Sequence, residues 1–260
     1  MVPRAVLLWV LALAPPARAS EGPFVATQLD AGPFYARFDA ALGMGVPFHH
    51  SLALETRAQP NFEGWMQWLG MTATWPGVTV RSGVRGVFPV DRTFLLPRER
   101  YTRFDTEVKE GPRAVHAAFE SELEAQATAG AVHLSSVLTA VSLLGVPEGR
   151  WVVEERIRVV TPGGWVFRAR GGVAWRFGPG EAFSAGAAAE VIWVAARGTH
   201  VLRAGPQLGA RLDERLELLL SILPAWSSPD SLGLAGGDVQ HLGVRWRWDA
   251  PLPRGGRLPQ

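Results

Sequence analysis

Long segments of this 260-residue chain alternate between apolar and polar residues with a period of two. From Phe34 to Val46 the even positions are Phe, Ala, Phe, Ala, Leu, Met and Val, whereas Arg37 and Asp39 are among the odd ones. Because successive side chains of a β-strand point to opposite faces, this alternation predicts strands with one apolar and one polar face, and helical spacing does not fit it. The pattern recurs in four further segments: 115–127, 165–177, 200–212 and 216–226.

The alternating segments are longer than the strands of soluble sandwiches, which have about five or six residues. Strands of this length suit a tilted crossing of a membrane, so we predict an all-β fold, an antiparallel transmembrane β-barrel. Single-chain barrels of bacteria have even strand numbers, which favours twelve strands after one segment within 49–75 is merged or demoted. Fourteen is the alternative if 24–30 adds a short strand. The candidate strands are 34–46, 49–57, 65–74, 78–88, 101–109, 113–127, 131–144, 150–160, 165–177, 182–195, 199–212, 215–226 and 238–249.

The first nineteen residues have the pattern of a secretory signal peptide. Arg4 precedes a ten-residue apolar run, and Ala17-Arg18-Ala19 supplies a cleavage site. Removing 1–19 takes Arg4 and Arg18 from the 26 basic residues and leaves 24 against 24 acidic residues, which gives no case for a nucleic-acid partner. The predicted organisation is a signal peptide (1–19), a periplasmic lead-in (20–33), the barrel (34–249) and a C-terminal tail (250–260).

Tryptophan is unusually frequent, with eleven residues against two tyrosines. Transmembrane barrels place aromatic girdles at the two membrane interfaces, and many of these tryptophans fall near the ends of the predicted strands. The alternative is that they fill the core of a soluble barrel. The residues near segment ends are Trp65, Trp68, Trp75, Trp151, Trp165, Trp175, Trp226, Trp246 and Trp248.

The octapeptide at 241–248 carries the most specific motif, with a polar His241, then Gly243, then Trp246 and Trp248 spaced by two. It resembles the C-terminal assembly signal of bacterial outer-membrane β-barrel proteins, a family that the whole chain after the signal peptide resembles. The resemblance implies a location in the outer membrane, contact with outer-membrane lipid and recognition by the barrel-insertion machinery. The chain departs from the family pattern because a tail, 249–260, follows the last tryptophan.

Two His-x-Ser pairs are the candidates for catalysis, at His49 and Ser51 and at His133 and Ser135. Residues two apart share a strand face, so each pair places an imidazole beside a hydroxyl. The motif resembles that of barrel lipid A deacylases, but it lacks the Asn that follows there, and no carboxylate stands at a spacing that would orient the base. The absence of cysteine and the scattered histidines give a metal site little support. We predict a non-enzyme with no catalytic residue, cofactor or metal.

The polar faces carry charges of both signs, which the barrel reading directs into the lumen. Opposite charges there would pair and fill the lumen; the alternative is an arginine ladder that guides anions through a pore. The predicted lumen charges are Arg81, Arg85, Arg168, Arg170, Arg176, Glu120 and Glu122.

Three functions follow from this reading. The first is a non-enzymatic barrel that docks other envelope proteins, as in the gliding-motility or secretion machines of Gram-negative bacteria. The second is a narrow passive channel, or porin, for small anionic solutes. The third is a lipid-modifying enzyme. A charge-paired lumen without a catalytic set favours the first.

Overall fold

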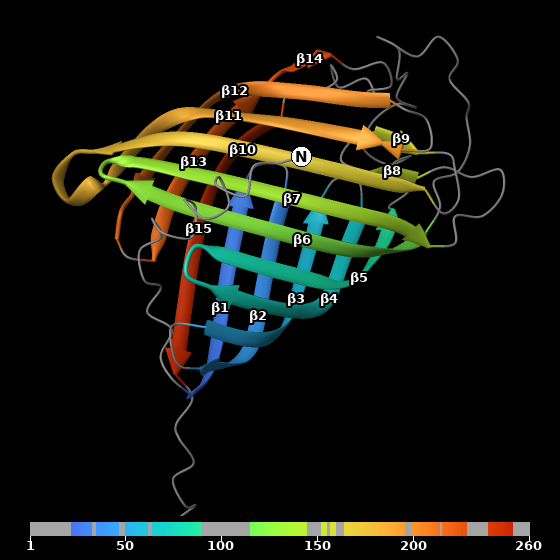
Figure 1. Ribbon diagram of the computed structural model, residues 1–260, viewed down its shortest axis with the longest axis horizontal. Helices are drawn as coiled ribbons and strands as arrows, with labels where there is room; N and C mark the ends of the chain where they lie inside the picture. The colour runs from blue at the N-terminus through green and yellow to red at the C-terminus, as the bar shows by residue number, and fades with distance from the viewer. Residues whose placement is uncertain are drawn as a thin grey trace, which may run out of the picture.

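The computed structural model describes residues 22–32, 35–46, 50–61, 64–89, 115–144, 152–154, 157–159, 164–195, 199–213, 215–227 and 239–251. Twelve strands in these ranges form one closed antiparallel barrel (Figure 1). A 3-10 turn, η2 (Pro179–Glu181), precedes β11, and no helix of the described residues is long and apolar enough to cross a membrane. The barrel strands are β1 (Gly22–Gly32), β2 (Tyr35–Val46), β3 (His50–Asn61), β4 (Gly64–Trp75), β5 (Val78–Pro89), β6 (His116–Ala129), β7 (Val132–Leu144), β10 (Trp165–Phe177), β11 (Phe183–Val194), β12 (Thr199–Arg211), β13 (Leu216–Leu223) and β15 (Val239–Pro251).

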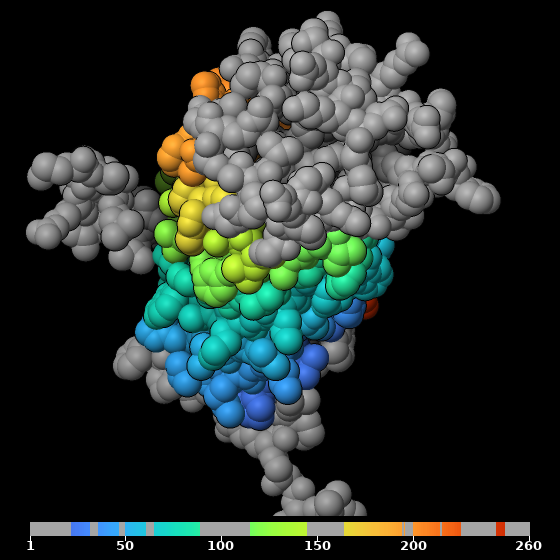
Figure 2. All heavy atoms as spheres, turned by 90° about the vertical axis from the view of Figure 1, so that its right-hand side faces the viewer, coloured from blue at the N-terminus to red at the C-terminus, as the bar shows by residue number. Residues whose placement is uncertain are grey.

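Each barrel strand pairs with the strand that follows it around the wall, and β15 returns to pair with β1. In the space-filling view of Figure 2, the strands from β2 to β6 follow one another in chain order, from blue to green. A short strand, β14 (Ala225–Ser227), continues β13 along β12 after Pro224, where the pairing register shifts. The antiparallel barrel predicted from the alternation is confirmed.

The predicted total of twelve strands is confirmed, but three assignments behind it differ from the structure. Residues 22–32, expected as a lead-in, form β1, which hydrogen-bonds to both β2 and β15 and so belongs to the wall. Both segments of the 49–75 region are separate full strands, so the expectation that one of them is merged or demoted is wrong. Within the segment 150–160 the described residues form the small hairpin of β8 (Val152–Glu154) and β9 (Ile157–Val159), outside the barrel sheet. The candidate strand 101–109 lies outside the described residues.

The two ends of the barrel differ in the length of their connections. At one end the strands are joined by 47–49, 76–77, 130–131, 178–182 and 212–215. Gly130, in a two-residue connection, has a φ of +59, which glycine adopts without a steric penalty. At the other end lie the two longest connections, 90–115 and 145–164. We call these the short-turn end and the long-loop end; β1 begins and β15 ends at the short-turn end.

The outward face of the barrel is apolar and has aromatic residues near both ends. On β10, Trp165 and Phe167 lie near the long-loop end, and Trp175 and Phe177 near the short-turn end. Residues 165 and 177 are about 40 Å apart along a strand, which at a tilt of about 45° spans about 28 Å, close to the thickness of a bilayer core. Among the tryptophans whose side chains the structure describes, the exposed ones are Trp65, Trp75, Trp165, Trp175, Trp193 and Trp246. The outward face therefore has the pattern of a transmembrane barrel.

Trp68 does not follow the interfacial expectation, because its side chain faces the lumen and is only 2% exposed. Its indole lies over two glycines on the lumen face: a Cβ at Gly70 or Gly83 would stand 2.6 Å or 2.8 Å from the Cζ2 atom of Trp68. The guanidinium of Arg57 lies 5.0 Å from the indole centroid, a cation–π distance. Trp151 lies outside the described residues, and the placement of Trp226 and Trp248 at an interface stays a prediction.

Candidate functional site: the charged lumen

The inward face of β3 to β6 carries a connected set of ion pairs. On β3, Glu55 and Arg57 are two residues apart, and the Nε of Arg57 donates to Oε1 of Glu55 at 2.7 Å. Arg81 of β5 contacts three carboxylates: Glu55 at 3.4 Å, Glu122 at 2.8 Å and Glu124 at 2.7 Å. Arg57 also reaches Glu122, at 3.3 Å. Charges on three strands are therefore joined in one network, which we call the mixed wall together with the other inward charges of β3 to β6.

Two further interactions complete the mixed wall. Arg85 of β5 lies 3.3 Å from Glu120 of β6, and both are buried. The Thr72 hydroxyl donates to Oε2 of Glu55. Arginine–carboxylate pairs at such buried positions need these additional hydrogen bonds, because removing two charges from water is costly.

The inward face from β10 to β15 is different, since arginine dominates it. Glu190 of β11 lies between two arginines: Arg168 of β10 at 2.5 Å and Arg203 of β12 at 3.0 Å. Glu190 and Arg203 are almost fully buried, with side-chain exposures of 2% and 3%. We call this face the arginine wall. By the strand registers its inward charges are Arg168, Arg170, Arg176, Glu190, Arg203, Arg211, Glu217, Arg245 and Arg247.

Further polar pairs involve β1 and β2, which lie between the two walls. Asp30 of β1 accepts a hydrogen bond of 2.8 Å from the Nε of Arg245 on β15, so an ion pair crosses the strand pair that closes the barrel. Arg247 donates to the Gln28 amide oxygen at 3.1 Å. On β2, Arg37 and Asp39 form a bidentate pair with a shortest distance of 2.6 Å.

The lumen side chains of seven consecutive wall strands, β2 to β7 and β10, surround a cavity of about 80 Å³. Arg37, Trp68 and Arg168 are among its lining residues and come from well-separated strands of the wall. This space admits a few water molecules and no larger solute. On this side of the barrel the inward side chains leave only this small space between them.

An apolar layer lies on the long-loop side of the ion pairs. Its residues are inward-facing, come from five neighbouring strands and are at most 2% exposed. Apolar side chains at these positions exclude water from this side of the lumen. The layer consists of Leu143, Val166, Ile192, Val201 and Leu223.

The structure brings five of the seven predicted lumen charges into ion pairs: Arg81, Arg85, Arg168, Glu120 and Glu122. Arg170 also faces the lumen and is engaged by a neighbour. Arg176 faces the lumen too, but none of the ion pairs between described residues includes it. The sequence reading left Glu190 and Arg203 out of the set, although their alternation with outward Val191 and Leu202 was a usable signal.

The two His-x-Ser candidates are placed differently. The ring of His50 meets that of Trp75 edge-on at 6.4 Å, whereas its neighbour Ser51 takes the opposite face of β3; His49 lies outside the described residues. His133 faces the lumen, where its Nδ1 lies 3.2 Å from the Thr128 hydroxyl. None of the hydrogen bonds found among the described residues joins His133 to a carboxylate, as a catalytic base would need. The described residues also contain no cluster of three metal-ligating side chains.

The predicted assembly motif lies on β15, the strand that closes the barrel between β13 and β1. Gly243 is buried opposite Leu219, and Trp246 is exposed on the outward face. His241 pairs with Ser221 and Trp248 with Thr27. These positions identify the strand that carries the motif; its recognition by an insertion machinery stays a prediction.

The fold and the lumen define the class of the protein as a twelve-stranded transmembrane β-barrel with an ion-paired interior. No family model matches the chain, and no curated protein matches it. Among solved structures, the chain is similar to the NanC porin, with 9% identity, 88% of this chain and 98% of that chain covered, and a TM-score of 0.37.

Two further solved structures show a comparable likeness. An anion-selective porin from Comamonas acidovorans has 9% identity, 87% and 98% coverage and a TM-score of 0.38. The β-domain of the Bordetella autotransporter BrkA has 11% identity, 90% and 100% coverage and a TM-score of 0.36. At these identities the likeness concerns the barrel fold alone.

Proposed function

We propose that this protein is a non-enzymatic barrel of the bacterial outer membrane that acts as a closed structural anchor and docks other envelope proteins, as in a motility or secretion assembly. The observation that carries the proposal is the lumen. The inward side chains of β2 to β7 and β10, many of them in ion pairs, leave a cavity of about 80 Å³ between them, and an apolar layer lies beside the ion pairs. A barrel filled in this way supplies a rigid wall in the membrane rather than a path through it.

The proposed orientation follows from the two ends. Bacterial outer-membrane barrels have short periplasmic turns and longer extracellular loops. The connections 90–115 and 145–164 would then face the outside, and the short-turn end the periplasm. Export by a signal peptide at 1–19 and insertion through the motif on β15 belong to the same proposal. Fractionation should recover the protein from the outer membrane, with heat-modifiable migration on gels; a soluble periplasmic protein would contradict it.

A narrow channel for small anions is the second candidate, and the arginine wall favours it. Seven inward arginines against two glutamates would attract anions if the lumen opened. In that case the two walls would act as the sides of a pore rather than as a filled interior.

Planar-bilayer recordings decide between the two candidates. We expect no stable unitary conductance from the wild-type barrel. A double variant, Arg57→Ala with Trp68→Ala, removes two side chains that line the cavity and serves as the opened control. Anion-selective unitary conductance from the wild type, lost on replacing Arg168 and Arg170, would establish the channel and overturn the anchor.

A further inference from the structure

Three arginines at the short-turn end of the arginine wall lie outside the ion pairs found among the described residues. Arg176 is the next-to-last residue of β10, Arg211 is the last of β12, and Arg247 lies on β15. The backbone N–H of Arg247 donates to the carbonyl of Arg215 at 2.9 Å, so Arg247 lies at the level of the connection 212–215. We call these three residues the short-turn arginines.

The described contacts of the short-turn arginines use only part of their hydrogen-bonding capacity. Arg211 donates to the backbone carbonyl of Gly180, and Arg247 donates to the amide oxygen of Gln28 at 3.1 Å. A guanidinium carries five N–H donors, so one such bond leaves most of them for another acceptor. Arg211 and Arg247 are exposed and Arg176 is half-buried, although the strand registers direct all three to the lumen. Water therefore reaches this end of the lumen.

The charge of the arginine wall is unbalanced, since seven inward arginines stand against two glutamates. Glu190 pairs with Arg168 and Arg203. Glu217, the second glutamate, lies 3.8 Å from Arg245. A protein surface that carries one sign of charge beside low-dielectric walls attracts groups of the opposite sign. The short-turn arginines therefore favour an anionic occupant.

The spacing of the short-turn arginines favours a chain segment over a single small anion. One strand separates β10 from β12 and one separates β12 from β15, so neighbouring members of the set stand about 10 Å apart along the wall. A carboxylate or phosphate ion engages one or two guanidiniums at a time. Alternate side chains of an extended chain are about 7 Å apart, so a short run of acidic residues brings carboxylates to all three. Ser184 and Gly186, inward residues of β11 at this end, are too short to cover the arginines.

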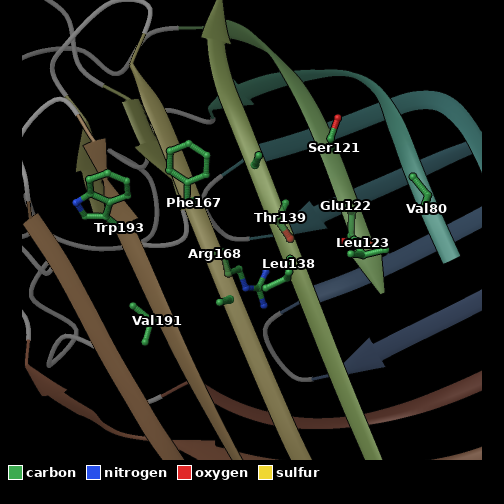
Figure 3. A pocket seen from close by; sticks show the side chains of 12 residues that line it. Val80, Ser121, Glu122, Leu123, Leu138, Thr139, Phe167, Arg168, Val191 and Trp193 are labelled. Atoms are coloured by element: carbon green, nitrogen blue, oxygen red, sulfur yellow. The ribbon is translucent and has the colours of Figure 1, made fainter. Parts of the chain in front are cut away.

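The same strands are filled beyond the short-turn arginines. Toward the long-loop end they carry Glu190 between Arg168 and Arg203, and then the apolar layer. Figure 3 shows Arg168 at this depth on β10, beside Thr139 of β7. A segment that enters from the short-turn end would meet these side chains instead of an open path along these strands. The arrangement suits docking better than passage.

We propose that the short-turn arginines dock an acidic segment of a periplasmic partner protein. Bilayer lipid does not reach them, because they face the lumen. Residues 252–260, which follow β15 at the same end, contain Arg254 and Arg257 but no acidic side chain, so this tail does not supply the carboxylates. The inference rests on the proposed docking function and orientation, and it adds the chemistry by which the partner is recognised.

The test uses the full-length protein in non-ionic detergent and a fluorescent oligoglutamate peptide that carries a photoreactive benzoylphenylalanine. We expect saturable binding by fluorescence anisotropy, weakened by added salt because salt screens exposed charges, and no binding of an oligoglutamine peptide. Cross-links in the wild type should map to the short-turn halves of β10, β12 and β15. The triple variant Arg176→Gln, Arg211→Gln and Arg247→Gln should bind about tenfold more weakly.

The matched control removes the same number of charges from the connection 90–115, as Arg98→Gln, Arg100→Gln and Arg103→Gln, and should bind like the wild type. No binding of oligoglutamate, or an equal loss in the control, would refute the docking surface. Displacement by free glutamate at the same carboxylate concentration would identify a small-anion site instead. Cross-links confined to the long-loop end would also refute the surface, and this wild-type map decides even if the triple variant does not fold.

Planar-bilayer recordings keep the failure of this inference distinct from the failure of the proposed function. A non-conducting barrel that does not bind the peptide would remove the docking surface and leave the anchor. Anion-selective conductance from the wild type would overturn the anchor, whether or not the peptide binds.

Discussion

The mixed wall and the arginine wall both neutralise several like charges in the lumen with one shared side chain, but the shared side chain is an arginine on the first and a glutamate on the second. On the mixed wall, Arg81 of β5 is shared by three glutamates on two other strands, β3 and β6. On the arginine wall, Glu190 is shared by two arginines. In each case one side chain neutralises several of the opposite sign, so its removal leaves like charges together in a poorly hydrated space. The comparison therefore predicts that the stability of each wall depends most on its shared side chain, Arg81 on the mixed wall and Glu190 on the arginine wall.

The largest effect is expected from Glu190→Ala on the arginine wall. Arg168 and Arg203 would lose their common partner, and removing one member of a buried ion pair costs about 4 kcal/mol. Urea unfolding of the refolded barrel, followed by tryptophan fluorescence, measures the free energy of unfolding. Glu217→Ala is the matched control, because its side chain is 34% exposed and lies 3.8 Å from Arg245. Equal destabilisation by the two variants would contradict the comparison.

Arg81→Ala should have the next largest effect, about 3 kcal/mol, because it leaves Glu55, Glu122 and Glu124 without their shared cation. The cost is lower than at Glu190 because Arg57 still contacts Glu55 and Glu122. The same unfolding experiment applies, and Arg81→Lys should recover part of the loss since it keeps the positive charge. A variant Arg81→Ala as stable as the wild type would show that the mixed wall does not depend on its scarce cation.

Arg37→Ala should destabilise the barrel by only about 1 kcal/mol. Its partner Asp39 lies on the same strand, β2, between the two walls, and the Arg37 side chain is 32% exposed. Water therefore compensates much of the lost pair. Thermal migration shifts on gels, compared with those of Arg81→Ala, check the order; a larger shift for Arg37→Ala would place a critical charge outside both walls.

The smallest effect is expected from Arg176→Gln, within about 0.5 kcal/mol of the wild type. Arg176 belongs to the arginine wall, yet no ion pair found among the described residues includes it. The prediction tests whether the stability of the wall depends on how many arginines it carries or on which of them share Glu190. Destabilisation comparable to that of Glu190→Ala would mean that every arginine of this wall is needed.

The sequence predicts the faces of the strands better than the contacts across them. Alternation directs Arg81, Glu122 and Arg168 to the lumen, because side-chain direction follows from a period of two. That Glu190 lies between Arg168 and Arg203 depends on the registers of β10, β11 and β12, which follow from turn lengths and from the stagger of the whole barrel. No local pattern contains this information.

Trp68 shows a second limit of the sequence reading. Both faces of β4 carry large apolar residues, with Leu69 and Met71 outward and Met66 and Trp68 inward, so hydrophobicity alone does not distinguish them. The inward position is possible because Gly70 and Gly83 leave room for the indole. The same spacing of small residues could have indicated it, since glycine in a strand often marks the close approach of another group.

The seam between β1 and β15 has a consequence for the order of folding. The ion pair of Asp30 with Arg245 joins residues separated by 215 positions, so the last contacts of the wall are also the most distant along the chain. Such distant contacts slow folding, because the whole intervening chain must be arranged before they form. Until β15 arrives, β1 and β13 present unpaired backbone edges, which template association with other chains. Pairing of β15 with β1 and β13 thus removes the last two unpaired edges of the sheet, and with them the tendency to associate with other chains.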